Sequence, residues 1–388
     1  MDTDCYQVRR RAGEIIFREG EAADCAYVIE AGRIEVSVSR QDGAVVLGEL
    51  GPGEILGEMA VIDQAPRTAT ATVTEDCILT TVTARQIQQR IERSDPIVRS
   101  LLGVLLERYR SELALTQEPP ALADSGFVQQ TSIGIEKIRF ENDLRRALEH
   151  GEVKVVYQPI HCLRRNLTAG FEALVRWDHP AEGTIPAARL VALAEETDLI
   201  IPLSLYVLRT AVQDFSVLEA AAPGDLFASV NVSPRHTMDS EFLNQAWDIC
   251  AAAERSPQDL MLELTESIRV DIDQLADWTR TARAMGFRLS VDDFGTGYAS
   301  LEYLTRLQPD TVKIDQNFVR AITGDWRHRA VMTKVLAMAA ELGVVVIAEG
   351  AETSEHVRVL SRMNCDMAQG YETGRPLAVS EAVAFLAE

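Results

Sequence analysis

Hydrophobic positions follow two different rhythms along the chain. Before residue 84, short apolar runs recur about every ten residues and are separated by glycines or charged turns, as in EIIFREG, CAYVIEAG, RIEVSVSR and TATATVTEDCILTTV. Runs of this length and spacing are typical of a β-sandwich or barrel. We therefore predict an N-terminal β jelly-roll domain with flanking helices.

From about residue 84 the pattern becomes helical. The stretch DPIVRSLLGVLLERYRSELAL places Val98, Leu102, Leu105 and Tyr109 at spacings of three to four residues, on one stripe. Such a stripe packs either onto its own barrel or onto the same helix of a second copy in a homodimer. Both interpretations stay open.

A linker follows, and after it the pattern of hydrophobic positions changes. Residues 116–126 (TQEPPALADSG) combine paired prolines and small residues without periodicity, so we place domains at 1–116 and 134–388 and a linker at 117–133. Beyond it, apolar runs such as VKVVYQ, LMLELTE and TVKID alternate with helical stretches such as AARLVALAEE. This alternation predicts a parallel sheet closed into a (β/α)8 TIM-like barrel.

Polar side chains stand at the ends of these apolar runs. They are acids, amides or a lysine: Asn231, Glu263, Asp292, Lys313, Glu349 and Gln369. The carboxyl ends of barrel strands meet at one mouth, where active sites of this architecture lie. We therefore expect these side chains to converge.

Two adjacent aspartates, Asp292 and Asp293 in VDDFGTGY, need a particular backbone because neighbouring side chains in a strand point to opposite faces. We expect the strand to end at this pair, so that Asp292 faces the mouth and the turn swings Asp293 round beside it. Gly295 and Gly297 give the turn its freedom.

Converging carboxylates repel one another unless cations neutralise them, and hard divalent ions with oxygen ligands are the ordinary remedy. No histidine accompanies these acids in the pattern and no cysteines are spaced for zinc, so Mg²⁺ or Mn²⁺ is favoured. Two such ions polarise a phosphoryl oxygen and lower the pKa of a bridging water. The reaction class that follows is phosphodiester hydrolysis.

Composition excludes several other functions. The net charge is −21, so no basic face is available for a nucleic-acid duplex. The N-terminus MDTDCYQVRR is polar and no run of about 18 apolar residues occurs, which predicts no membrane span, no signal peptide and a cytoplasmic location. Six scattered cysteines indicate reduced thiols.

The second half resembles the EAL-domain family. FEALVRW, NVS, ELTE, DDFGTGYASL, VKID, AEGAET and QGY occur in that family's order and spacing, from about residue 134 to the C-terminus. The resemblance implies a cyclic di-GMP phosphodiesterase that uses two Mg²⁺ or Mn²⁺ ions and releases linear pGpG.

The resemblance also implies residue roles. The metal ligands would be Glu172, Asn231, Glu263, Asp292, Asp293 and Glu349. Lys313 would orient the attacking water, and Glu349 or Glu352 would handle protons. Substrate would meet Arg176 through a phosphate and Leu174 through a guanine face, with Gln158 and Gln369 also lining the site. Glu266 would support the loop after Asp293 and a dimer contact.

Small departures from the family pattern leave these positions intact. His236 stands where glutamine is common, Ala299 replaces a serine, and residues 372–374 replace a more apolar triplet. The alternative of a degenerate receptor, which binds cyclic di-GMP without cutting it, usually lacks one of the acids. Because each acid is present here, hydrolysis is the favoured interpretation.

The first half resembles cyclic-nucleotide-binding domains over roughly residues 6–115, through CAYVIEAGRIEV and GEILGEMAVIDQAPRTATATV. The second stretch corresponds to a phosphate-binding cassette, and its implied ligand-binding residues are Gly57, Glu58, Met59, Ala60, Arg67 and Thr68. Amides near Gly57 would receive a cyclic phosphate, Arg67 would fork onto its free oxygens, and Glu58 would accept from the ribose hydroxyl. An empty cassette that serves as a scaffold is the alternative.

Together the halves suggest a signal converter. We expect a cyclic nucleotide to alter the hydrolysis rate in a homodimer. Thr68 does not decide between the two nucleotides, and cyclic AMP is favoured over cyclic GMP. A cyclic-nucleotide-type transcription factor is disfavoured, because no helix-turn-helix follows and the charge is wrong for DNA.

Overall fold

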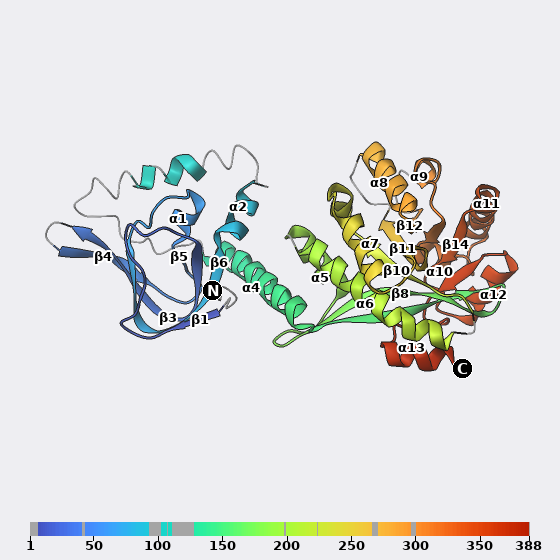
Figure 1. Cartoon of the computed structure of the whole chain (residues 1–388), viewed down its shortest axis with the longest axis horizontal. Coiled ribbons are helices and arrows are strands. Elements are labelled where there is room, and N and C mark those ends of the chain that lie inside the picture. Colours follow the sequence, from blue (N-terminus) through green and yellow to red (C-terminus); the bar gives the residue numbers. More distant parts are fainter. Residues whose placement is uncertain are drawn as a thin grey trace. The chain divides into compact units, whose positions relative to one another are not determined.

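The computed structural model describes residues 7–40, 43–92, 102–106, 108–110, 128–197, 199–222, 224–265, 271–295 and 300–387. These form two compact units, Met1–Asp143 and Leu144–Glu388 (Figure 1). Most of the predicted linker lies outside the described residues, but residues 128–133 begin helix α4 (Val128–His150). The proposed limits at 116 and 134 stay a prediction.

The N-terminal unit contains a six-stranded antiparallel sheet, which confirms the jelly-roll prediction (Figure 1). The strand order is β1 (Gln7–Arg10), β6 (Thr70–Thr83), β3 (Cys25–Arg40) and β4 (Gly43–Leu50); β2 (Ile15–Phe17) pairs with β6, and β5 (Ile55–Leu56) with β3. Helix α1 (Glu58–Ile62) follows β5 and helix α2 (Ala84–Glu92) follows β6.

Strand β3 joins what the sequence suggested were two runs. It passes through Gly32, where its register against β6 shifts. A Cβ on Gly32 would lie 2.3 Å from the Asp76 carbonyl oxygen, and φ is +89° there. Only glycine fits this close approach, which lets one bent strand span both runs.

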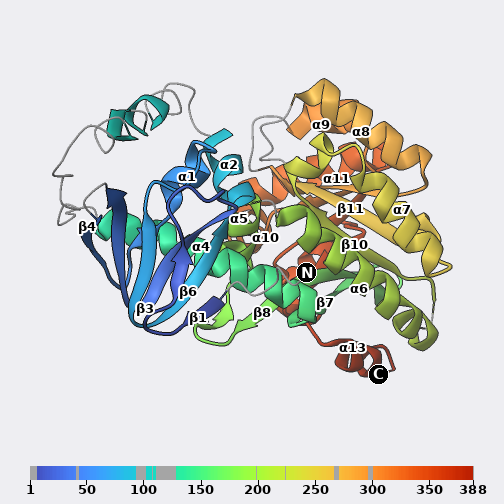
Figure 2. The ribbon, with the colours of Figure 1, turned by 60° about the vertical axis from the view of Figure 1, so that its left-hand side comes forward.

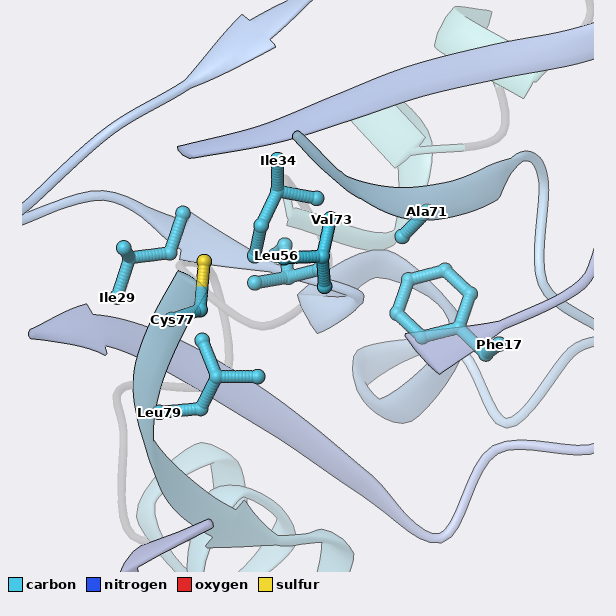
Figure 3. Packing of buried hydrophobic residues seen from close by; sticks show 8 residues of the cluster. All are labelled: Phe17, Ile29, Ile34, Leu56, Ala71, Val73, Cys77 and Leu79. Carbon is cyan, nitrogen blue, oxygen red and sulfur yellow. The ribbon is translucent and has the colours of Figure 1, made fainter. Parts of the chain in front are cut away.

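The core of this unit lies between its strands. Its buried side chains are Phe17, Ile29, Ile34, Leu56, Ala71, Val73, Cys77 and Leu79 (Figure 3). Four of them lie on β6 and are separated by two or four residues, so their side chains share its inner face: Ala71, Val73, Cys77 and Leu79. Full burial of such larger aliphatic or aromatic chains contributes roughly 1.5–3 kcal/mol each.

The C-terminal unit is a closed barrel of eight strands with helices outside it. The strand order is β10 (Phe227–Val232), β11 (Leu260–Thr265), β12 (Arg288–Phe294), β13 (Thr311–Ile314), β14 (Val345–Ala348), β15 (Met367–Gln369), β7 (Val153–Cys162) and β8 (Leu167–His179). Pairing of β8 with β10 closes the ring, and β9 (Gly183–Ile185) extends β8. Strand β7 runs antiparallel to both neighbours, unlike the rest.

The helices follow the strands around the outside of this barrel (Figures 1 and 2). They are α5 (Ala187–Glu196), α6 (Ile200–Ala221), α7 (Phe242–Ala252), α8 (Ile272–Ala284), α9 (Ser300–Leu307), α10 (Gln316–Ala321), α11 (Trp326–Leu342), α12 (Ser354–Arg362) and α13 (Val379–Leu386). Several begin at side-chain caps: Asp271, Asp315, Asp325 and Thr353 each accept a backbone N–H of the first turn. None of the described helices is long and apolar enough to cross a membrane.

The predicted apolar stripe before the linker is only partly described. Leu105 is 61% exposed, Tyr109 lines the cavity considered below, and Val98 lies outside the described residues. Packing of the whole stripe on the barrel is therefore not what the structure shows, since Leu105 faces solvent.

Candidate active site and nucleotide site

Strand register gathers the polar strand ends at one barrel mouth. Asn231 pairs with Glu263, and Thr265 pairs with Asp292 one strand further on. Glu172 and Lys313 come from β8 and β13, and Glu349 follows β14 directly. The parallel ladders thus place side chains from distant parts of the sequence side by side.

Lys313 lies at the centre of the mouth and is fully buried. Its Nζ is 2.7 Å from Glu349, 2.9 Å from Glu263, 3.1 Å from Glu172 and 3.7 Å from Asp292. Four acids around one ammonium leave an excess of negative charge. In a buried setting that excess requires protons or additional cations.

Glu172 is held by amides as well as by the lysine. Asn231 Nδ2 donates to its Oε1 at 2.8 Å, and Gln369 Nε2 donates to its Oε2 at 2.6 Å. Gln369 also reaches Gln158 Oε1 at 3.3 Å, and Gln158 Nε2 reaches the Gly374 carbonyl at 3.4 Å. Because the amide nitrogen of Asn231 is used here, its oxygen is the atom suited to a cation.

The aspartate pair lies in a β-bulge, and the prediction that the strand ends there is wrong. Strand β12 continues to Phe294, and its register shifts between Val291, opposite Val312, and Phe294, opposite Ile314. Two residues of β12 therefore oppose the single Lys313 of β13. Asp293 takes a left-handed φ of 56°, and its N–H donates to Asp292 Oδ1 at 2.9 Å.

This backbone brings three acids into ligating range. Carboxylate oxygens of Asp292, Asp293 and Glu349 all lie within 4.8 Å of one another. Glu263 Oε1 is buried next to them without a hydrogen-bond partner among the described residues. An all-oxygen donor set with an unpartnered carboxylate oxygen fits a hard divalent cation.

Burial and mutual charge perturb the acids differently. Burial raises the pKa of Glu349 to about 7, and Asp292 and Glu172 add to the rise against the opposing pull of Lys313. Burial also raises the pKa of Glu263 well above its usual value. Burial pushes the pKa of Glu172 upward too, but Lys313, Gln369 and Asn231 outweigh it and the net pKa is lowered. The surrounding acids likewise overcome burial and raise the pKa of Lys313.

The other predicted residues lie at different places. Glu352 is on the surface and pairs with Arg320, so it is not among the acids that contact Lys313. Arg176 is half-buried and donates to the Val175 carbonyl at 2.7 Å. Glu266, Gly297 and Ala299 lie outside the described residues.

A pocket of about 440 Å³ adjoins the acids and was not anticipated from the sequence. Leu174, Asn231 and Asp293 line it together with apolar residues of α5 and α6, and Glu195 lies in its wall, accepting from Ser233 Oγ at 2.9 Å. Nothing local in AARLVALAEE marks Glu195, because its neighbourhood arises only when α5 folds against β8.

The N-terminal cassette surrounds a second cavity of about 110 Å³. Its lining includes all the predicted residues, namely Gly57, Glu58, Met59, Ala60, Arg67 and Thr68, together with Phe17 and Tyr109. Gly57 has φ +77°, and a Cβ there would lie 2.4 Å from Arg67 Nη1. Glycine is therefore needed for Arg67 to reach its position. Tyr109 was placed by the sequence on a packing stripe and not in this site.

Arg67 is only 4% exposed and is held by neutral groups. Its Nη1 donates to the Gly57 carbonyl at 2.7 Å, its Nη2 donates to the Cys25 carbonyl at 2.6 Å, and its Cζ lies 4.1 Å from the Phe17 ring centroid. Within the described part of the chain no carboxylate forms an ion pair with it. Burial raises the pKa of the nearby Glu58 carboxyl, against the opposing charge of Arg67.

Models of known families match both halves of the chain. A model of the EAL domain matches residues 141–376, which is more than half of the chain. The chain belongs to the EAL-domain family. A model of the cyclic nucleotide-binding domain matches residues 7–94 of this EAL protein.

Its relatives include cyclic di-GMP phosphodiesterase NbdA of Pseudomonas aeruginosa, 34% identical over 252 residues, which are 65% of this chain and 32% of that protein. The probable cyclic di-GMP phosphodiesterase PdeG of Escherichia coli is 31% identical over 63% of this chain and 48% of its own. The chain thus spans about a third to a half of these relatives.

A solved structure of similar architecture is the EAL enzyme Bd1971 in its cAMP-bound form, with 31% identity and a TM-score of 0.64. The match covers 98% of this chain and 100% of that one. The same enzyme has been solved with cGMP, and with cAMP and cyclic di-GMP together.

Proposed function

We propose that this EAL protein hydrolyses cyclic di-GMP to linear pGpG with two bound Mg²⁺ or Mn²⁺ ions, and that a cyclic nucleotide, cyclic AMP in preference to cyclic GMP, sets the rate. The observation that carries the hydrolysis is the cluster of Glu172, Glu263, Asp292 and Glu349 around the buried Lys313. A receptor that only binds would have no need for so many mutually repelling acids.

The ions would be held by Glu172, Asn231, Glu263, Asp292, Asp293 and Glu349. When bound, they supply polarisation of the phosphoryl oxygen and an acidified water. Lys313 contributes a positive charge inside the low-dielectric mouth, where it stabilises negative charge developing on the phosphoryl group. Glu349 lies at the mouth with an oxygen 2.7 Å from Lys313 Nζ, so proton handling is assigned to it, whereas the surface position of Glu352 gives it no such role.

Substrate binding would use the adjoining pocket. A guanine base is flat and apolar on its faces, and Leu174 with the apolar residues of α5 and α6 provides matching walls. Arg176 would leave its Val175 carbonyl to meet a phosphate, and Gln158 and Gln369 would border the sugar-phosphate ring.

Regulation would begin at Arg67. A buried guanidinium without a partner carboxylate is costly, and the singly charged cyclic phosphate offers two oxygens to its fork. The solved nucleotide complexes of Bd1971 support this assignment by similarity.

The test is product analysis. Purified protein is incubated with cyclic di-GMP and Mg²⁺ or Mn²⁺, with and without each cyclic nucleotide, and the products are separated. We expect pGpG only with the metal and at a rate that cyclic AMP changes. Binding of cyclic di-GMP without any product would favour the receptor alternative. If titrations of the protein with cyclic AMP and with cyclic GMP both show no binding, the alternative of a scaffold-type N-terminal domain is favoured.

A further inference from the structure

Two of the three glutamines of helix α2, Gln86 and Gln88, bond in different directions. Gln88 Nε2 donates to the carbonyls of Val61 at 2.7 Å and Ile62 at 3.2 Å, at the end of α1. Helix α1 starts directly after Gly57, whose carbonyl accepts from Arg67. Gln88 therefore ties α2 to the cassette.

Gln86 points elsewhere, since side chains two apart on a helix diverge by roughly 200°. It is 5% exposed, and its Nε2 donates to Asn142 Oδ1 at 2.9 Å and Glu141 Oε1 at 3.2 Å, both on α4. Its Oε1 accepts from the Thr83 N–H at 2.9 Å, and Asn142 Nδ2 donates to the Thr81 carbonyl at 3.2 Å. Buried polar contacts of this kind are directional and are lost if α4 shifts.

Strand β3 repeats this link between cassette and α4. The Cys25 carbonyl accepts from Arg67, and five residues later Glu30 accepts from Arg139 of α4 at 2.6 Å and from Thr80 at 2.8 Å. A change in the hold of Arg67 on Cys25 therefore occurs on the strand that also holds α4.

The bonded part of α4 is continuous with the start of the catalytic unit. Glu141 and Asn142 are the first two residues of the EAL match, and the same helix continues through Leu144 and Ala147, which are fully buried. Helix α4 is continuous from Glu141 and Asn142 to its end at His150.

We propose that α2 is a relay between the nucleotide cassette and the EAL domain, with Gln88 and Gln86 as its two contacts. When a cyclic phosphate draws Arg67 from the Gly57 carbonyl, α1 is released to shift, Gln88 carries the shift into α2, and Gln86 alters its hold on Glu141 and Asn142. This inference rests on the proposed regulation and assigns residues to it.

The decisive variant is Gln86→Met, which keeps the volume and removes the donors and acceptor. Full-length protein is assayed for cyclic AMP affinity by calorimetry and for cyclic di-GMP hydrolysis with and without saturating cyclic AMP. We expect affinity within threefold of wild type and a ratio of the two rates that falls to within twofold of one. Arg85→Met, an exposed neighbour on α2, is the matched control and should keep the wild-type ratio. Gln88→Met should behave like Gln86→Met.

Hydrogen exchange supplies a readout that does not depend on catalysis or on a fragile fold. Cyclic AMP should change the exchange of amides 139–147 in wild type but not in Gln86→Met, after melting curves show both to be folded. If cyclic AMP changes the hydrolysis rate and the hydrogen exchange equally in wild type and in Gln86→Met, the relay is refuted and the proposed regulation stands. A wild type whose hydrolysis and exchange both ignore cyclic AMP and cyclic GMP overturns the regulation and the relay with it. A wild type without hydrolysis overturns the enzyme, while the exchange data still judge the relay.

Discussion

Two buried cations, Lys313 in the barrel and Arg67 in the jelly roll, are stabilised by opposite means. Lys313 is surrounded by four carboxylates and is part of a cluster with excess negative charge. Arg67 is held by two carbonyl oxygens and an aromatic face, and among the described residues no carboxylate lies within ion-pair distance of it, although Glu58 is nearby. A site of the first kind calls for further cations and a site of the second kind for an anion. The comparison predicts ligand charge from the local balance of charge.

The largest expected effect comes from removing the first cation. Lys313→Met should lower cyclic di-GMP hydrolysis by about a hundredfold to a thousandfold, because a preorganised charge at the phosphoryl group is lost. Product formation under saturating Mg²⁺ measures it, with exposed Lys334→Met on α11 as the control. If a folded Lys313→Met protein hydrolyses cyclic di-GMP at the wild-type rate, the role assigned to Lys313 in the barrel is wrong.

A buried base whose pKa is set mainly by burial should show the contrasting behaviour, although Asp239 opposes the shift. His236 is fully buried and bonded to the Ser233 carbonyl at 2.9 Å, and burial lowers its pKa to about 4. Between pH 6.5 and 4, His236 is protonated in the unfolded chain but not in the folded chain. Its contribution to the free energy of unfolding is therefore fully present above pH 6.5 and is lost as the pH falls toward 4, by about 3 kcal/mol in total.

Replacement of His236 by the glutamine common in the family isolates this contribution. His236→Gln should show a smaller loss of unfolding free energy between pH 6.5 and 4 than wild type, in denaturant titrations. Exposed His150→Gln should leave the loss unchanged. Equal slopes for all three proteins would mean that the pKa of His236 does not differ between the folded and the unfolded chain.

Metal binding sharpens the claim of excess negative charge. Mg²⁺ at a hundred times its dissociation constant should stabilise the folded chain by about 2.7 kcal/mol, seen as a higher melting temperature. Asp292→Asn should lose much of this gain, whereas Asp248→Asn on the exposed face of α7 should keep it. A melting temperature that ignores Mg²⁺ in wild type would argue against ions at the mouth.

The smallest expected effect concerns the second cation. Arg67→Leu should weaken cyclic AMP binding by about tenfold to a hundredfold, the loss expected when hydrogen bonds to a charged group are removed. Calorimetry of the full chain measures it, and exposed Arg18→Leu is the control. Unchanged affinity in Arg67→Leu would show that the carbonyl-bound position of Arg67 is also its position with nucleotide.

Sequence patterns predicted this molecule unevenly, for physical reasons. Strand periodicity and the polar ends of the runs were enough for the two folds and for the meeting of Glu263 with Lys313, because the parallel strands of the barrel end at one mouth. The sequence predicted that Asp292 and Asp293 lie side by side, but it attributed this to the end of the strand. The structure shows a β-bulge instead, and a bulge depends on pairing with β13. Period and composition do not encode such a pairing.

Contacts between distant elements also escaped the sequence. Gln86 is one polar residue in a helical stretch that contains two other glutamines, and its bonds to Glu141 and Asn142 form only where α4 docks beside it. Glu352 shows the reverse case. Its nearness to Glu349 in the chain made it a candidate, but the turn after β14 carries it to Arg320 at the surface.

The bulge in β12 has a consequence for how the protein tolerates insertions and deletions. Deleting Asp293 would let Asp292 oppose Lys313 and restore an unbroken ladder from Val291 to Phe294. We expect such a shortened chain to fold at least as stably, while losing one of the acids proposed to hold the ions. The fold would then not depend on the extra residue, whereas the proposed chemistry would. We expect an EAL domain whose sequence lacks one residue at this position to keep the fold and to lose hydrolysis.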